Sequence, residues 1–545
     1  MASTVLASPE STQPSRAVDL DRPAHPIARV VFAGLVVAGF AYAGVSVFLD
    51  TQQVGEQLAT GVFLFLGLAL LIALGFEFVN GFHDTANAVA TVIYTNSMPA
   101  NLAVMWSGFF NFLGVMLSSG AVAYSIVTLL PVDLILNVGS GAGFAMIFAL
   151  LLAAVMWNLA TWYVGLPNSS SHTLIGSVLG VGLANQLLHR GPGGTSGVDW
   201  SQATKVLSGL LMAPVIGFVA AALMLLVLRA VARNPTLMQS PEGDAPPPRG
   251  IRALLVFTCT AVSFSHGSND GQKGMGLIML ILIGCAPTAY ALNRTLPASE
   301  TPAFYASADA AARVLASHGA APVPLARARP VLVDALSHRR VDTPAAYGAA
   351  IAVSRDVAGR VASYGSLDRV PAEATPNLRN DMYLVLDATR MIGKDADKHG
   401  FSNAETARLK DYQSRLEAGT RYIPLWVKVA VALALGLGTM IGWKRIVVTV
   451  GEKIGKQHMT YGMGASAELV AAGTILAADR FGLPVSTTHI LSSGVAGASV
   501  ASGMGLQRRT LIQLAAAWIM TLPVAMLLSG VLYWLLLQLV ESGAF

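Results

Sequence analysis

The residues in this chain best suited to binding chemistry form a short polar run that occurs twice. Gly165-Leu-Pro-Asn-Ser-Ser-Ser-His172 is matched in spacing by Gly482-Leu-Pro-Val-Ser-Thr-Thr-His489. In each copy a Gly and a Pro interrupt an apolar segment, and the helix that follows would begin with free N–H groups and the positive end of its dipole. Hydroxyl groups at such a helix start bind anions. We therefore predict a site for a tetrahedral oxyanion lined by Ser169, Ser170, Ser171, Ser486, Thr487 and Thr488.

Two carboxylates accompany this pair of motifs. Asp84 ends the run Asn80-Gly-Phe-His-Asp84, and Asp270 ends the run Ser265-His-Gly-Ser-Asn-Asp270. A charged group at the bilayer centre costs about 2.5–3.5 kcal/mol on insertion scales, and such groups mark ion pathways. We expect both carboxylates to lie at helix breaks, although a structural hydrogen-bond acceptor is the alternative role. The predicted cation and proton site comprises His83, Asp84, Asn87, Asn269, Asp270 and Lys273, with Asp84 and Asp270 as candidate metal ligands.

The two acidic motifs differ in their titratable neighbours. Asn87 and Lys273 each follow an aspartate by three residues and so lie on the same helix side as that aspartate. The Lys273 ammonium would pair with Asp270 in the place of a bound monovalent cation. Because His titrates at a pH of about 6.5 and a buried Lys shifts its pKa readily, these differences favour proton coupling. Two further acids in apolar segments, Glu77 and Glu468, fit proton transfer and helix packing equally well.

The composition indicates that membrane-spanning helices position these motifs. Hydrophobic residues make up 54% of the chain and charged residues only 12%, with a mean hydropathy of +0.59. The basic pI of about 9.2 does not imply a nucleic-acid partner, because the Lys and Arg residues lie mainly in short loops, where they orient a membrane protein. The two cysteines, Cys259 and Cys285, share one apolar segment and predict no disulfide framework.

The pattern of apolar segments predicts an all-α membrane protein with broken helices and an extra N-terminal transmembrane helix. Breaks are expected near 80–84, 167–172, 265–270 and 484–489. The predicted regions are a disordered cytoplasmic tail at 1–27, the extra helix at 28–49, a first repeat at 58–230, a cytoplasmic loop at 231–250, a second repeat at 251–290 with 425–540, and an extracytoplasmic insertion at 291–424.

The distribution of Lys and Arg predicts the orientation of these segments. Basic residues gather in the N-terminal tail and in the loops 231–250 and 444–458, which are therefore expected in the cytoplasm, with the C-terminus outside. Segments that carry matching motifs then cross in opposite directions. The prediction is an inverted-topology repeat of five plus five crossings, whose interrupted helices mark a transporter's site at the midplane.

These motifs resemble the signatures of the PiT inorganic phosphate transporters, most closely the bacterial low-affinity PitA type. The resemblance rests on Gly81-Phe-His-Asp-Thr-Ala-Asn-Ala88, His266-Gly-Ser-Asn-Asp270 and the two Pro-x-Ser-Ser/Thr-Ser/Thr-His runs, and it covers most of 58–286 and 425–540. It implies that the hydroxyl residues bind phosphate and that Asp84, Asn87 and Asp270 form cation sites. The family motif usually has Asn where this chain has His83 and Lys273, which favours H⁺ over Na⁺.

The sequence therefore predicts a secondary transporter that imports inorganic phosphate by proton symport and alternating access. The expected cargo is phosphate complexed with Mg²⁺ or another divalent cation; no cofactor, catalytic residue or nucleic-acid partner is expected. The expected location is the bacterial inner membrane, as a homodimer in the lipid bilayer. The alternatives are a Na⁺-coupled phosphate or sulfate symporter, a passive anion channel, and an intramembrane hydrolase that uses Ser171 and His172.

Overall fold

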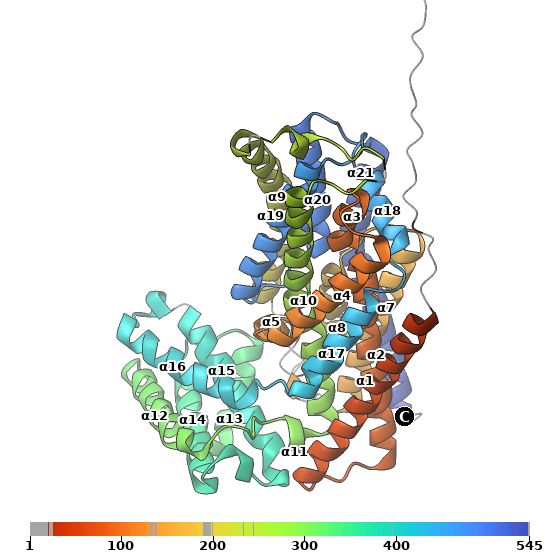
Figure 1. The fold of residues 1–545 in the computed structure, drawn as a ribbon. Helices are drawn as coiled ribbons and strands as arrows, with labels where there is room; N and C mark the ends of the chain where they lie inside the picture. Colours follow the sequence, from red (N-terminus) through yellow and green to blue (C-terminus); the bar gives the residue numbers. More distant parts are fainter. Residues whose placement is uncertain are drawn as a thin grey trace, which may run out of the picture.

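The apolar segments of the sequence fold into helices in the computed structural model. The structure describes Leu20 and residues 26–542 except 85, 131–134, 137–138, 189–197, 199, 233, 244 and 395, together with the side chains of these residues except those of 86, 87 and 201. Across this described part the chain contains no strand, only an isolated bridge between Gly455 and Leu506 (Figure 1). The predicted all-α fold class is confirmed, and the tail expected at 1–27 falls almost entirely outside the described residues.

The membrane helices fall into two sets separated by helices α11 to α16. The first set comprises α1 (Pro26–Gln53), α2 (Thr60–Asp84), α3 (Ala86–Tyr94), α4 (Ala100–Leu117), α5 (Ala121–Val127), α7 (Gly141–Tyr163), α8 (Ser170–Leu188) and α9 (Trp200–Val231). The second set comprises α10 (Arg249–Cys285), α17 (Leu425–Gly438), α18 (Lys444–Glu452), α19 (Tyr461–Arg480), α20 (Thr487–Ser502) and α21 (Arg508–Glu541).

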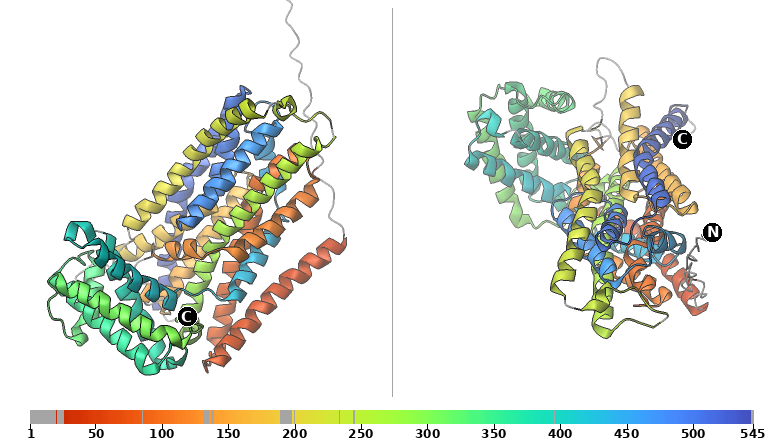
Figure 2. Two further views of the ribbon diagram at one scale, coloured as in Figure 1. Left: turned by 60° about the vertical axis from the view of Figure 1, so that its left-hand side comes forward. Right: turned by 90° about the horizontal axis from the view of Figure 1, so that it is seen from above.

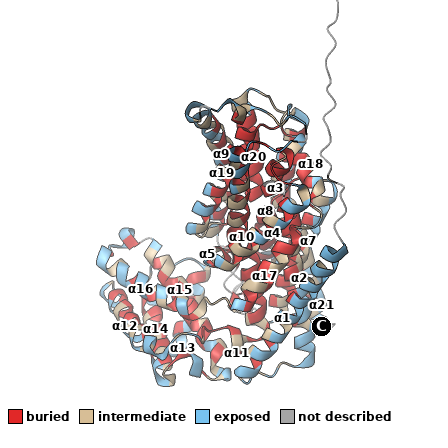
Figure 3. Cartoon of the chain, in the orientation of Figure 1, coloured by how far each residue is buried: buried red, intermediate tan, exposed pale blue. Residues whose placement is uncertain are grey.

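The long apolar helices cover the outside of the bundle. In the described part, 6 helices are long and apolar enough to span a membrane alone, and a bent pair at 403–420 and 425–438 gives up to 7 candidates. Helix α1 is largely exposed, whereas the buried residues concentrate in the middle of the bundle (Figure 3). The inner helices α8, α10, α19 and α20 are largely buried by neighbouring helices, and they carry most of the polar motifs.

Helices α7 and α8 form a hairpin that turns halfway along α21. The turn contacts Thr521, which bonds to Trp157 at 3.2 Å and to Asn168 at 2.5 Å. The two open ends lie near the C-terminal end of α21, because Gly141 packs on Val540 and Asn185 accepts a hydrogen bond from Tyr533 at 2.9 Å. The chain therefore enters and leaves the bundle at one end.

Helices α19 and α20 form a second hairpin of the same kind, with its open ends at the opposite end of the bundle. The segments before α19 and after α20 are joined by the Gly455–Leu506 bridge. The turns of the two hairpins contain Gly165 with φ +70° and Gly482 with φ +63°, a backbone conformation that favours glycine. The expected breaks near 167–172 and 484–489 are present, and at each of them the chain reverses direction, so the two flanking helices form a hairpin.

The break expected near 265–270 is absent, because α10 is one continuous helix from Arg249 to Cys285. The glycines that suggested a break serve close helix packing instead: a Cβ on Gly267 would lie 2.1 Å from the backbone oxygen of Asn111 in α4. Gly81 in α2 packs in the same way, since a Cβ on it would lie 2.3 Å from the Leu435 oxygen of α17.

The α2–α3 pair and α10 run in opposite directions. Glu56, just before α2, accepts hydrogen bonds from the backbone N–H groups of Thr288 and Ala289, just after α10. At the other end Arg252 of α10 donates to the Ser97 oxygen, just after α3, at 2.8 Å. Helices of the first set also pack on helices of the second set in matching pairs. Helix α4 packs on α10 while α17 packs on α2, and α8 packs on α21 while α20 packs on α9.

Helices α11 to α16 lie at one end of the bundle, the end that also holds the C-terminal end of α21 (Figure 2). Helices α12 to α16 share a hydrophobic core of their own, whereas Tyr290 of α11 belongs to the core of the bundle. The bounds of α11 to α16 are Pro287–Tyr290, Thr301–Ser317, Leu325–Ser337, Pro344–Tyr364, Thr375–Lys394 and Asn403–Thr420. The buried Arg379 attaches this α11–α16 cluster to the bundle by donating to the Ile135 oxygen at 3.1 Å, and the Arg421 guanidinium lies 5.0 Å from the centre of the Tyr124 ring.

Candidate functional site

The two aspartates meet in the middle of the bundle. Asp84 is the last residue of α2, whereas Asp270 lies in the middle of the continuous helix α10. Both are buried, at 3% and 1% exposure. Their proximity follows from the packing of α2 on α10, since no short segment of sequence connects them.

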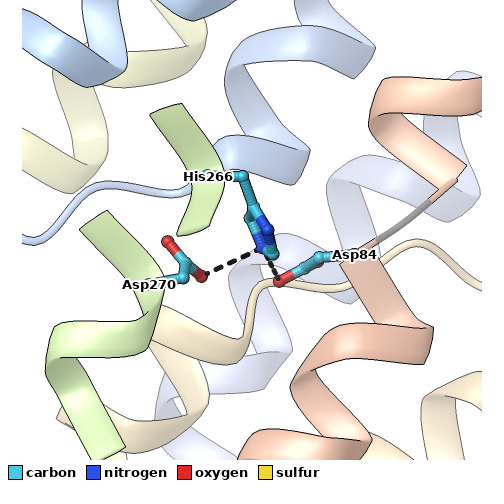
Figure 4. A group of neighbouring side chains, drawn as sticks. All are labelled: Asp84, His266 and Asp270. Carbon is cyan, nitrogen blue, oxygen red and sulfur yellow. Dashed lines mark ion pairs between the residues drawn. The ribbon is translucent and has the colours of Figure 1, made fainter. Parts of the chain in front are cut away.

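His266 lies between the two carboxylates (Figure 4). Its Nε2 is 3.8 Å from Asp84 Oδ2 and 3.6 Å from Asp270 Oδ2, and its Nδ1 is 2.7 Å from the Asn111 side-chain oxygen. Ligand atoms of Asp84, His266 and Asp270 all lie within 4.8 Å of one another, a geometry that could hold a metal ion. His266 was not among the predicted site residues. His266 precedes Asp270 by four residues, a spacing that puts both side chains on one face of a continuous helix. Because a helix break was expected between them, this shared face was not predicted from the sequence.

Each hydroxyl run reaches the acidic motif of the other set of helices. Thr488, from the α19–α20 hairpin, donates a hydrogen bond to Asp84 Oδ1. Ser171, from the α7–α8 hairpin, accepts a hydrogen bond from the Lys273 ammonium, whose Nζ lies 2.7 Å from Asp270 Oδ1. The hydroxyl of Ser171 donates to the Val485 oxygen at 2.7 Å and so also joins the two hairpin turns.

The remaining hydroxyl residues start the two inner helices. Ser169 Oγ accepts from the backbone N–H of His172, and Ser486 Oγ accepts from that of His489, both at 3.1 Å. The imidazole rings of these two histidines lie 4.4 Å apart, so the first turns of α8 and α20 adjoin. Ser170 accepts from Asn158 at 3.3 Å, and the buried Thr487 Oγ1 has no hydrogen-bond partner among the described residues. Two helix N-termini and their hydroxyls thus converge on one place.

Two predicted residues with described side chains, His83 and Asn269, lie around this centre without forming it. His83 bonds to Thr161 of α7 at 3.2 Å and approaches Asp84 at 3.6 Å. Asn269 fixes the second hairpin turn by donating to the Leu483 oxygen at 3.1 Å. The side chain of Asn87 lies outside the described residues, so its predicted place at the cation site stays a prediction.

Two further buried carboxylates flank the centre. Glu77 packs against Gly274, one turn beyond Asp270 on α10, and its Oε1 has no hydrogen-bond partner in the described part of the chain. Glu468 accepts a 2.5 Å hydrogen bond from Thr258, about three turns of α10 before Asp270. None of the predicted site residues with a described side chain is more than 3% exposed, so the centre is closed to solvent in this conformation.

The chain is similar to one protein family and to several named proteins. The model of the phosphate transporter family matches residues 80–529. The chain is 42% identical to the low-affinity inorganic phosphate transporter PitB of Escherichia coli K12, over 89% of this chain and 100% of the relative. It is 44% identical to PitA of the same strain, over 88% of this chain and 99% of that one.

A solved structure described as the sodium-dependent phosphate transporter shares 19% identity over 87% of this chain and 98% of that one, with a TM-score of 0.46. The curated relatives are named as transporters, which agrees with the expectation that the chain is not an enzyme. Since the family model covers most of its length and both relatives match almost from end to end, the chain belongs to the phosphate transporter family.

Proposed function

We propose that this protein imports inorganic phosphate, as a complex with Mg²⁺ or another divalent cation, by symport with protons. The observation that carries the proposal is the crossed contact between the two sets of helices, in which Thr488 meets Asp84 and Ser171 meets the Asp270–Lys273 pair. This arrangement puts oxyanion donors and cation ligands side by side. A metal–phosphate complex needs both kinds of group at one site.

Phosphate would bind at the adjoining first turns of α8 and α20. Hydroxyl and backbone N–H donors there hold an anion without a strong ion pair, so the anion can also leave. The Thr487 hydroxyl is buried and free to donate, and the Lys273 ammonium adds positive charge nearby. The other hydroxyls would exchange their present partners for phosphate oxygens when the cargo enters.

The divalent cation of the cargo would bind to Asp84, His266 and Asp270. Carboxylate and imidazole ligands suit several divalent ions, and the three side chains already converge. Protonation near His83, Asp84 or Asp270 would neutralise the buried charges before the cargo moves. Charge compensation of this kind is needed because an unpaired charge inside the bundle is costly.

Alternating access would follow from an inverted-topology repeat, in which residues 58–230 form one half and residues 251–290 with 425–540 form the other, oppositely oriented half. Support comes from the opposite directions of α2–α3 and α10, and from the matching pairs of packed helices between the two sets. The described residues between α9 and α10 lie with α18 at one end of the bundle, and α11 to α16 lie with the C-terminal end of α21 at the other (Figure 1). We assign the first end to the cytoplasm of a bacterial inner membrane protein and propose a homodimer in the bilayer.

Reconstitution of the purified protein tests this function. Proteoliposomes would take up labelled phosphate with Mg²⁺ when an inward proton gradient is imposed, and a Na⁺ gradient at equal pH would not drive accumulation. Accumulation driven only by Na⁺, or competition by sulfate equal to that by phosphate, would assign the coupling or the anion to the alternatives. Downhill flux that never accumulates cargo would indicate a channel.

A further inference from the structure

The second acidic motif contains a buried ammonium where the first motif has an amide. Lys273 follows Asp270 by three residues, as Asn87 follows Asp84. The Lys273 side chain is 0% exposed and is among the largest fully buried side chains of the described chain. A buried lysine of this kind needs compensation by nearby acceptors, because an ammonium inside a protein is costly when it is left unpaired.

The acceptors around Lys273 are oxygen atoms. Its Nζ lies 2.7 Å from Asp270 Oδ1 and donates to Ser171 Oγ, and the Ser171 hydroxyl in turn donates to the Val485 oxygen at 2.7 Å. The ammonium can only donate, so the direction of this chain of hydrogen bonds is fixed. Lys273 therefore connects α10 to the turns of both hairpins.

A carboxylate, a hydroxyl and a neighbouring carbonyl are also the oxygen ligands that a hard cation prefers. The ammonium of Lys273 carries the charge of a monovalent cation and occupies the position that such an ion would take beside Asp270. Because it is covalently attached, it cannot be released on the other side of the membrane.

We propose that Lys273 is a tethered cation that replaces a transported Na⁺ in the second half of the protein. The inference rests on the proposed symport and assigns its cation specificity: the second half needs no mobile monovalent cation beside Asp270. Replacing the lysine by a shorter neutral residue would leave Asp270, Ser171 and vacated space, which together would accept Na⁺.

The test compares Lys273→Asn, which copies the first motif, with wild-type protein in NaCl or choline chloride of equal concentration. In about 100 mM salt, Na⁺ should raise the unfolding temperature of the purified variant by about 2–5 °C, and that of the wild type by less than about 1 °C. The double variant that combines Lys273→Asn with Asp270→Asn should lose this Na⁺-dependent rise in unfolding temperature. Lys428→Asn, which removes an ammonium that donates to the Ser118 oxygen, is the matched control and should show none.

The transport measurement extends the same comparison. Phosphate uptake by Lys273→Asn proteoliposomes should rise at least about fivefold when Na⁺ replaces choline, whereas wild-type uptake should not change. A Lys273→Asn protein without a Na⁺-specific shift, or a wild-type shift of the same size, would overturn the proposal. A Lys273→Asn protein that folds in neither salt would also overturn the proposal, because Na⁺ would then fail to replace the ammonium. The unfolding measurement requires no phosphate, so it is independent of whether proton symport is correct.

Discussion

The two halves of the protein carry the same acidic motif but compensate its charge differently. Asp84 ends a helix, accepts a hydrogen bond from Thr488 and has two histidines, His83 and His266, within 3.8 Å. Asp270 lies inside a continuous helix and forms a 2.7 Å ion pair with Lys273. Asp84 therefore has imidazole and hydroxyl groups as neighbours, whereas the partner of Asp270 is an ammonium on its own helix. From this difference we propose that Asp84, and not Asp270, is the carboxylate whose charge changes during transport.

Replacing Asp84 tests this difference most strongly. Removing one partner from a buried charged contact costs about 2–5 kcal/mol, so Asp84→Asn should lower phosphate uptake by about 30-fold to 4000-fold. Initial uptake rates in proteoliposomes at equal protein density measure the loss. Asp309→Asn is the control, because that aspartate lies on the surface of the α11–α16 cluster. Uptake of Asp84→Asn within twofold of the wild type would remove Asp84 from the site.

Loss of the Thr488–Asp84 contact should lower phosphate uptake more than loss of the Ser171–Lys273 contact. Thr488→Val removes a hydrogen bond to a charged group, worth about 1.5–3 kcal/mol, and should lower uptake by about 10-fold to 100-fold. Ser171→Ala leaves Asp270 paired with Lys273, and its loss should be only about 3-fold to 10-fold. The same uptake assay compares both variants, and the reverse order would contradict the assignment of the mobile charge to the first half.

His266 links the two halves, and its replacement should alter the metal requirement. Loss of one ligand or its supporting contact lowers metal affinity by about 10-fold to 100-fold. His266→Gln should therefore raise the Mg²⁺ concentration for half-maximal phosphate uptake by at least about tenfold, and chelation of divalent cations should lower wild-type uptake. Titration of Mg²⁺ into metal-depleted proteoliposomes measures both effects. An unchanged Mg²⁺ dependence would show that the cluster does not hold the metal of the cargo.

In helix packing, by contrast, the two halves should behave alike. A Cβ on Gly81 would lie 2.3 Å from the Leu435 oxygen, and one on Gly267 would lie 2.1 Å from the Asn111 oxygen. Gly81→Ala and Gly267→Ala should each destabilise the protein by about 1–3 kcal/mol and lower its unfolding temperature by a few degrees. Gly209→Ala, with no atom within 4 Å of the added Cβ, is the control. A large difference between the first two variants would mean that only one half is closely packed.

The repeated motifs allowed the fold class and the family to be predicted, because hydroxyl runs, paired aspartates and apolar segments are local features. The same local features were misleading at Gly267 and Gly271. Glycines beside polar residues suggested a break, but in α10 they allow a neighbouring backbone or side chain to approach closely. That mistake also hid His266, whose place beside Asp270 depends on an unbroken helix.

The amino-acid sequence by itself determined which chemical groups the protein has and that they lie within a membrane. It also determined that Lys273 follows Asp270 at a helical spacing, so their ion pair needs only a helix to form. Only the tertiary structure decided that Thr488 meets Asp84 and that both hydroxyl runs lie at hairpin turns. The physical reason is that these contacts join segments far apart in the chain, and their geometry depends on how the helices pack and on which way each turn redirects the backbone.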